Sequence, residues 1–195
     1  MKAINIIFFL SLPLFTMAQA ASGKGLSIGY YGDFFSHPGL KITYEVPLAY
    51  RLKTKDKPDQ TIQRHKLKLL ESSFIWYQHQ GNHIGLILLP EYTMRRTNEN
   101  GSKRDFSFGL GYHRSFLNAK TYVLEDGGTF SLKKWAGQNT LFASFTYGLG
   151  KDYRWTQQKP WAWDVSFGLN ARTPYNSSVI MGLHANVGLT YFFNL

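Results

Sequence analysis

Residues 179–195 read VIMGLHANVGLTYFFNL, and apolar residues alternate with mostly small or polar ones along the whole stretch. The apolar row consists of Val179, Met181, Leu183, Ala185, Val187, Leu189, Tyr191, Phe193 and Leu195. Successive side chains of a strand point to opposite faces, so the pattern predicts one long strand with an apolar and a wet side. Strands of soluble proteins usually have about five or six residues, whereas a strand that crosses a bilayer needs roughly 9–11. The length therefore indicates a membrane-crossing strand.

Seven earlier segments alternate in the same way. They are Gly25–Phe35, Leu40–Leu52, Ile62–Gln78, Asn82–Thr97, Arg104–Leu117, Thr140–Lys151 and Trp161–Arg172. Proline cannot donate to a strand ladder, so Pro47 predicts a bulge in the second segment. The pairs Leu69-Leu70 and Ser72-Ser73 blur the alternation of the third segment and predict a second bulge there.

The chain ends in Tyr191-x-Phe193-x-Leu195, which resembles the terminal signature of small eight-stranded Gram-negative outer-membrane β-barrel proteins. Those proteins usually finish on an aromatic residue, and this chain finishes on leucine. The predicted fold class is all-β, an eight-stranded antiparallel up-and-down transmembrane β-barrel. The resemblance implies a location in the cell outer membrane of a Gram-negative bacterium. It also implies insertion by the outer-membrane barrel assembly machinery, which reads the terminal strand.

The first residues of the chain favour export. Lys2 precedes an apolar run from Ile4 to Phe15, and Ala18-Gln19-Ala20 has the small-x-small pattern of a cleavage site. We expect residues 1–20 to be a cleaved signal peptide and residues 21–195 to form a single outer-membrane barrel domain. An uncleaved anchor is the alternative. The apolar run is too short to cross a membrane as a helix.

Composition limits the chemistry and the partners. Without residues 1–20, which hold one lysine, 21 basic residues stand against 12 acidic ones, a net charge of +9. The anionic partners expected for an exported barrel are outer-membrane lipids and lipopolysaccharide, not nucleic acid. The absence of cysteine excludes disulfides and thiolate chemistry. We expect no cofactor or metal, and a monomer.

The two faces of the strands predict what lies inside the barrel. The bulky aromatic row belongs outside, because eight strands leave an interior just wide enough for side chains. The predicted lumen charges are four acids, Glu45, Glu91, Asp105 and Asp164, and four bases, Lys41, Arg51, Arg95 and Arg172. Pairing of these charges predicts a plugged lumen without a pore. A soluble β-sandwich with solvated charges is the alternative. In an even-stranded barrel both termini lie in the periplasm.

Histidines supply the candidate site residues. His37, His79 and His83 fall at connections on the outer rim, where His79 and His83 straddle a turn and can approach across strands. His113 faces inward with Ser115, a pair suited to nucleophilic catalysis if an acid orients the base. Ser36, His37 and Asp33 form a second candidate set. The alternative is that the rim histidines are ordinary turn residues.

The spacing His113-Arg114-Ser115 is similar to the His-x-Ser pair of lipid A deacylase barrels, which this chain also resembles in size and architecture. The neighbouring residues differ from that pattern, and no acid partner is evident. The first hypothesis is therefore a structural or lipopolysaccharide-contacting envelope protein without a pore. The alternative is a lipid-modifying enzyme, a lipid A or phospholipid acyl hydrolase or transferase. Passive transport is disfavoured by the paired lumen charges.

Overall fold

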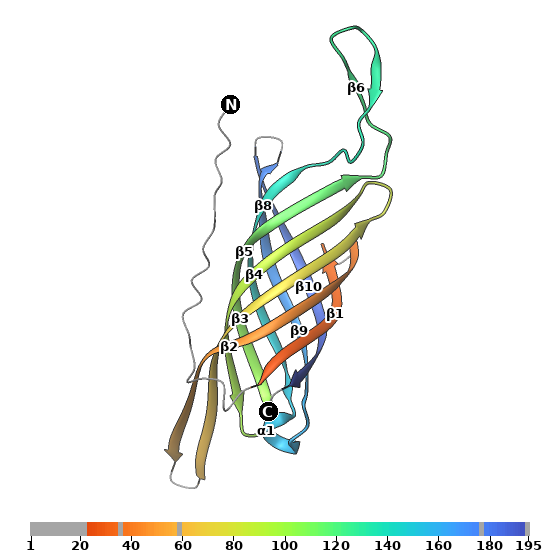
Figure 1. The fold of residues 1–195 in the computed structure, drawn as a ribbon. Coiled ribbons are helices and arrows are strands. Elements are labelled where there is room, and N and C mark those ends of the chain that lie inside the picture. The colour runs from red at the N-terminus through yellow and green to blue at the C-terminus, as the bar shows by residue number, and fades with distance from the viewer. Residues whose placement is uncertain (1–22, 35–36, 58–59, 176–177, 194–195) are drawn as a thin grey trace, which may run out of the picture.

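The alternating segments close into a barrel in the computed structural model, which describes residues 23–34, 37–57, 60–175 and 178–193. The elements are β1 (Lys24–Asp33), β2 (His37–Lys57), β3 (Gln60–His79), β4 (His83–Asn98), β5 (Ser102–Leu117), β6 (Tyr122–Leu124), β7 (Phe130–Leu132), β8 (Asn139–Asp152), α1 (Arg154–Gln157), β9 (Trp161–Tyr175) and β10 (Ser178–Phe193). Eight strands form the closed barrel in the order β1-β10-β9-β8-β5-β4-β3-β2, and all neighbours are antiparallel (Figure 1). The predicted fold class is confirmed. The predicted signal peptide and Ser36 lie outside the described residues.

The faces of the strands are as the alternation predicts. Along β10 the side chains of Val179, Met181, Leu183, Val187, Leu189 and Tyr191 are exposed on the outer surface. The facing positions His184, Asn186 and Thr190 are buried in the lumen. On β4 the outward apolar row runs from Ile84 to Met94. At about 3.4 Å per residue and a tilt of about 40°, this row covers roughly 25 Å, the height of a lipid-facing apolar band.

A bulge lies in β2, as Pro47 predicts, and the register shifts between Pro47 and Ala49. The second predicted bulge is wrong, because β3 pairs with β4 without interruption from Arg64 to His79. The extra residue, Leu48, is absorbed in β2, where the proline nitrogen leaves the ladder incomplete.

The bulge reverses which residues of β2 face the lumen beyond it. Tyr50 pairs with Leu67, which is buried, so Tyr50 faces the lumen side. Arg51 therefore points outward and is exposed. The prediction that Arg51 is a lumen charge is wrong, because alternation was continued through the bulge.

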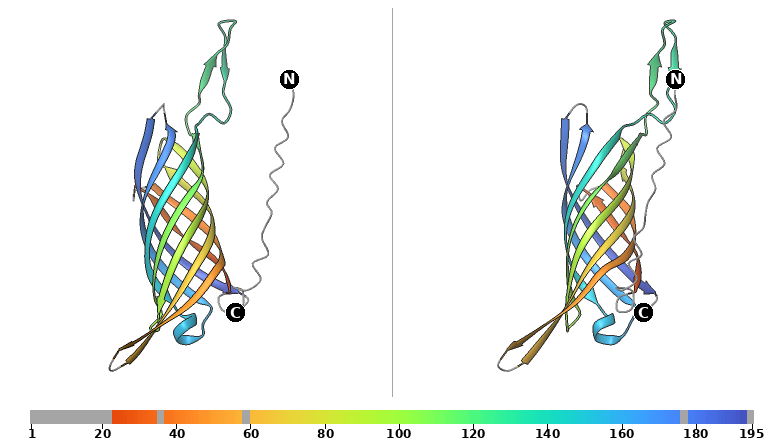
Figure 2. Two further views of the ribbon diagram at one scale, coloured as in Figure 1. Left: turned by 90° about the vertical axis from the view of Figure 1, so that its left-hand side faces the viewer. Right: turned by 60° about the vertical axis from the view of Figure 1, so that its left-hand side comes forward.

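The two ends of the barrel differ (Figure 2). We call the end at which the β6–β7 hairpin projects the loop end; this hairpin pairs only with itself and lies in the connection between β5 and β8. The other end, where β1 begins and β10 ends, carries α1 and is called the α1 end. At the α1 end β2 and β3 pair as far as Lys57 and Gln60, so both strands continue beyond the predicted segments that end at Leu52 and begin at Ile62. Neither the β6–β7 hairpin nor the extension of β2 and β3 was predicted.

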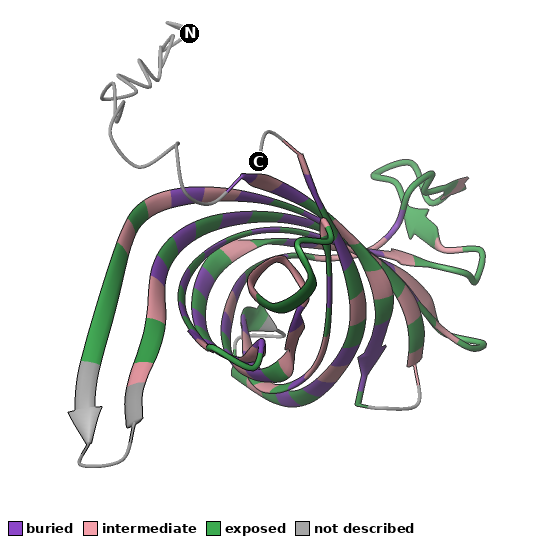
Figure 3. Cartoon of the chain, turned by 90° about the horizontal axis from the view of Figure 1, so that it is seen from below, coloured by how far each residue is buried: buried purple, intermediate pink, exposed green. Residues whose placement is uncertain are grey.

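The α1 helix lies across the α1 end of the barrel (Figure 3). Its Trp155 stacks on His65 with 3.8 Å between ring centroids and on Tyr50 at 6.0 Å. The Arg154 guanidinium lies 3.2 Å from the centre of the Phe192 ring and pairs with Asp152 at 2.6 Å. These contacts hold the helical turn against the lumen opening. Among the described residues, no helix is both long and apolar enough to pass through a membrane.

Candidate functional site

The three rim histidines of the sequence prediction meet at the loop end. His37 pairs with Asp33 across β1 and β2, and His79 pairs with His83 across β3 and β4. The His37 and His79 rings stack with 3.8 Å between centroids, and the His79 and His83 rings meet edge to face at 5.1 Å. The cluster therefore joins two hairpins that are adjacent in the barrel.

His37 and His83 lie beyond the apolar band, and their surroundings favour the neutral ring. Burial, followed by the neighbouring His79, lowers the pKa of both imidazoles below the ordinary value of 6.5. A neutral imidazole can accept a proton or ligate a metal. Within the described part of the chain, however, no three His, Cys, Asp or Glu side chains are arranged to hold a metal ion.

A hydrogen-bonded network lies below the histidines and is centred on Tyr77. Arg172 donates to the Tyr77 hydroxyl at 2.9 Å and to the Asp33 carboxylate at 2.6 Å. The same hydroxyl lies 2.9 Å from Nε2 of His113 and 3.4 Å from Nε2 of His83. The network joins strands from opposite sides of the barrel, so it cross-links the wall at the loop end.

Glycines in the wall make room for the rings of this region. A Cβ atom on Gly85 would lie 2.2 Å from the Tyr77 ring, and one on Gly168 would lie 2.4 Å from the His184 ring. These small lumen-facing residues therefore leave the space that the large rings occupy. His184 also stacks on Tyr31 at 5.7 Å and contacts the Thr146 hydroxyl at 3.1 Å, apart from the rim histidines.

His113 and Ser115 share the lumen face as predicted, but they do not form a nucleophile–base pair. Both ring nitrogens of His113 are in contact with hydroxyl groups, Nε2 with Tyr77 and Nδ1 with Thr140, each at 2.9 Å. The Ser115 hydroxyl instead accepts a hydrogen bond from the backbone N–H of Gln138 at 3.0 Å. Activation of serine requires a hydrogen bond to its base, so the pair is not poised for hydrolysis in this arrangement.

A cavity of about 410 Å³ opens among these groups at the loop end. Its polar lining comprises Asp33, His37, His79, Asn82, His83, His113, Ser115, Thr121, Lys133, Gln138 and Arg172. The predicted candidates His37, His79, His83, His113 and Ser115 therefore face one cavity, together with Asp33 of the second candidate set. Tyr77 and Lys133 were not predicted as parts of the site. Tyr77 carried no signal beyond its place in an alternating strand, and Lys133 reaches the cavity from a long connection.

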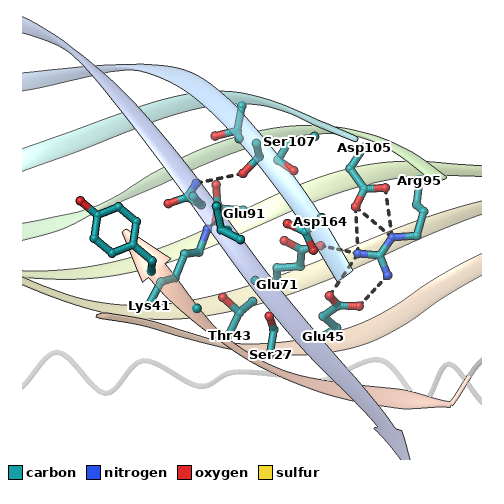
Figure 4. A pocket seen from close by; sticks show the side chains of 18 residues that line it. Ser27, Lys41, Thr43, Glu45, Glu71, Glu91, Arg95, Asp105, Ser107 and Asp164 are labelled. Atoms are coloured by element: carbon teal, nitrogen blue, oxygen red, sulfur yellow. Dashed lines mark hydrogen bonds and ion pairs between the residues drawn. The ribbon is translucent and has the colours of Figure 1, made fainter. Parts of the chain in front are cut away.

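The middle of the barrel is filled by charged side chains (Figure 4). Arg95 donates to the Glu45 carboxylate at 2.7 and 3.1 Å and to both oxygens of Asp105 at 3.1 Å. Lys41 pairs with Glu91 at 2.9 Å. Apart from Arg51, the predicted lumen charges lie inside. Glu71 and Lys103 are buried charges that the sequence analysis did not name, and Asp33, named there only as an acid beside His37, is buried as well.

The remaining space in this region is a cavity of about 50 Å³, lined by Lys41, Glu45, Glu71, Glu91, Arg95, Asp105 and Asp164, among others. A water molecule occupies roughly 30 Å³ in the liquid, so this cavity has room for one or two waters.

Comparison with solved structures agrees with this architecture. The N-terminal β-barrel domain of Pseudomonas aeruginosa OprF is similar with a TM-score of 0.53 and 12% identity, over 88% of this chain and 98% of that one. The outer-membrane enzyme PagL is similar with a TM-score of 0.51 and 8% identity, over 87% and 99%. Neisserial surface protein A has a TM-score of 0.47 at 10% identity, over 87% and 94%. At these identities the likeness to OprF and PagL concerns the fold: this chain has the architecture of small eight-stranded outer-membrane β-barrels. No protein-family model and no curated protein matches the sequence.

Proposed function

We propose that the protein resides in the outer membrane as a barrel without a pore, and that its loop end contacts lipopolysaccharide without altering it chemically. The lumen supports the first part. Its central charges are paired, and the space among them admits one or two waters. The α1 helix and its stacked rings further obstruct the opposite opening.

A basic and aromatic group at the edge of the loop end is the observation that carries the proposed contact, and one of its members, Lys133, also lines the rim cavity. The Arg114 guanidinium lies 5.2 Å over the Phe116 ring and donates to the Trp135 carbonyl at 2.7 Å. Trp135 is 77% exposed, and its ring meets Phe116 at 5.9 Å. The exposed lysines of the same connection are Lys120, Lys133 and Lys134. We call Arg114 and these three lysines the loop-end edge.

This combination suits a phosphorylated lipid. Aromatic rings of membrane barrels lie at the level of the headgroups, and Lys and Arg beside them attract lipid phosphates. The phosphate groups of lipopolysaccharide carry the complementary charge, and its acyl chains suit Phe116 and Trp135.

The test compares two variants that each lose four positive charges. One is R114Q/K120Q/K133Q/K134Q at the loop-end edge, and the other is R51Q/K66Q/R96Q/R104Q at the outer surface of the α1 end. Binding of purified lipopolysaccharide is measured by titration in detergent, with far-UV circular dichroism as the folding check. We expect the loop-end variant to bind at least tenfold more weakly and the α1-end variant to bind as the wild type does. Equal binding by all three proteins would refute the proposed contact.

A lipid-modifying enzyme is the second candidate function, and the rim cavity is the observation that favours it. Neutral imidazoles of His37 and His83 face the same cavity as Lys133 and Arg172, an arrangement in which a base lies near cationic groups. Mass spectrometry of lipid A and phospholipids from cells lacking or overproducing the protein decides between the two. A defined mass change that disappears in H79Q/H83Q or in H113Q would establish the enzyme, and an unchanged lipid profile would favour the contact function.

A further inference from the structure

Four basic residues lie side by side on the outer surface of four neighbouring strands near the α1 end. Arg51 of β2 pairs with Lys66 of β3, Lys66 pairs with Arg96 of β4, and Arg96 pairs with Arg104 of β5. Directly opposite residues share a face of the sheet, so all four side chains point outward. We call Arg51, Lys66, Arg96 and Arg104 the basic row.

The next positions on either side add further positive charge. Lys53 pairs with Arg64 toward the end of the β2–β3 hairpin, and both are exposed. On the barrel side Lys68 lies opposite Met94. At the margin of this surface the Glu99 carboxylate accepts a hydrogen bond from the backbone N–H of Gln63.

Such a row has an electrostatic cost for the isolated protein. Like charges directly opposite each other destabilise a sheet. The mutual repulsion shows at Lys66, whose pKa is lowered below its ordinary value first by Lys53, then by its partial desolvation and by Arg96, Arg51 and Arg64. Four cations held against one another in this way are stabilised by an anionic partner.

The position of the row identifies the partner. The next outward row toward the loop end is Lys68, Met94, Phe106 and Tyr147, so on β4 and β5 the basic row comes directly after apolar and aromatic residues. Where an apolar band ends, the lipid headgroups begin. Because the strands are tilted, the row crosses this boundary obliquely, from Arg104 nearest the apolar band to Arg51 farthest from it. The row therefore lies in the headgroup region, where lipid phosphates are found.

The β2–β3 hairpin extends this surface away from the barrel (Figures 1 and 3). The hairpin leaves the barrel wall and projects to the side of it beyond the α1 end. A wall that flares in this way turns its outer face toward the bilayer. Lys53 and Arg64 share this outer face with the basic row.

We propose that the basic row binds the phosphate groups of anionic glycerophospholipids in the leaflet at the α1 end. The proposal rests on the bilayer-spanning part of the proposed function and is independent of the loop-end edge. It assigns the two ends of the barrel to different lipids, with lipopolysaccharide at the loop end and phospholipid at the α1 end.

Native mass spectrometry of the purified full-length protein in detergent tests the assignment. Phosphatidylglycerol, phosphatidylcholine and lipid A are each added in turn to the wild type and to the two charge variants. Each Lys or Arg near an anionic surface strengthens binding about fivefold, so loss of two engaged residues alone weakens it about 25-fold. We expect R51Q/K66Q/R96Q/R104Q to bind phosphatidylglycerol about 25-fold more weakly or worse. R114Q/K120Q/K133Q/K134Q should bind it as the wild type does.

Other outcomes would overturn the proposal. Unchanged phosphatidylglycerol binding by R51Q/K66Q/R96Q/R104Q would refute the site. An equal loss in both charge variants would show attraction by net charge alone. If the variant lost binding of lipid A alone, the row would bind lipopolysaccharide and not glycerophospholipid. Because the substitutions relieve repulsion, this variant should withstand urea at least as well as the wild type, so that weaker binding is not explained by unfolding.

Discussion

Replacing Arg95 with glutamine tests whether the lumen charges hold the barrel together. The Arg95 side chain is 2% exposed and contacts three carboxylates, those of Glu45, Glu71 and Asp105. Glutamine keeps much of the length of the side chain but removes its charge and three of its five N–H donors. The three carboxylates then lose their common counter-ion, and Lys103, which contacts Asp105 at 3.5 Å, remains as the nearest cation.

The expected loss follows from the burial of this cluster. Removing one partner of a buried ion pair costs about 3–5 kcal/mol, because the other charge stays buried and uncompensated. A slope of about 2–3 kcal/mol per molar urea converts this loss into a shift of the unfolding midpoint by about 1–2.5 M. Acidic buffer should recover part of the loss, since protonation removes the charge of the stranded carboxylates.

The neighbouring residue provides a matched control. Arg96 follows Arg95 on β4 but faces outward and is exposed. Urea unfolding of both variants in vesicles of zwitterionic phosphatidylcholine, which offer the basic row no anionic lipid, is followed by tryptophan fluorescence and measures the two free energies. Arg96→Gln should change the unfolding free energy by no more than about 0.5 kcal/mol. If the two variants unfold within about 1 kcal/mol of each other, the lumen network does not carry the stability assigned to it here.

Three further expectations concern the loop end and the bulge. Tyr77→Phe removes a hydroxyl shared by the rim network and should lower the unfolding free energy by about 1–3 kcal/mol in the same assay. The folded state lowers the pKa of His37 and His83 below 6.5. The unfolding free energy should therefore be highest above about pH 6.5 and fall at lower pH, because the unfolded chain takes up protons there. Replacing both histidines with glutamine should flatten this part of the pH profile. Deleting Leu48 removes the extra residue of the bulge and should turn Arg51 toward the lumen; a cysteine at position 51 would then react with a water-soluble maleimide more slowly than in the undeleted chain.

The strands were predictable because a barrel wall imposes the same period on every segment. Each outward position meets lipid and each inward position meets a narrow lumen, so large apolar and small or polar residues must alternate. Elements outside the wall obey no such rule. The β6–β7 hairpin pairs only with itself, and α1 is a single turn whose Trp155 is held by stacking on distant rings. Neither leaves a periodic signal in the sequence.

The sequence predicted which residues gather at the candidate site but not which hydrogen bonds they form. Loop connectivity placed His37, His79 and His83 at one rim, and strand parity placed His113 and Ser115 on one face. Which atoms meet depends on residues from other strands. His113 is bound by Tyr77 and Thr140, 36 and 27 positions away, and these contacts decide that it does not face Ser115 as a base. The spacing of His113 and Ser115 along the chain does not predict such partners.

The bulge in β2 links the closure of the barrel to its outer surface. Pro47 cannot complete the ladder, so the strand takes up one residue more than its partner and its faces exchange. Beyond the bulge Tyr50 turns inward, where it stacks with Trp155, and Arg51 turns outward beside Lys66. Without the extra residue, the α1 helix would lose an aromatic partner and the basic row would lose one of its four charges. A local irregularity of one residue therefore supports both the obstruction of the lumen and the surface proposed to bind phospholipid.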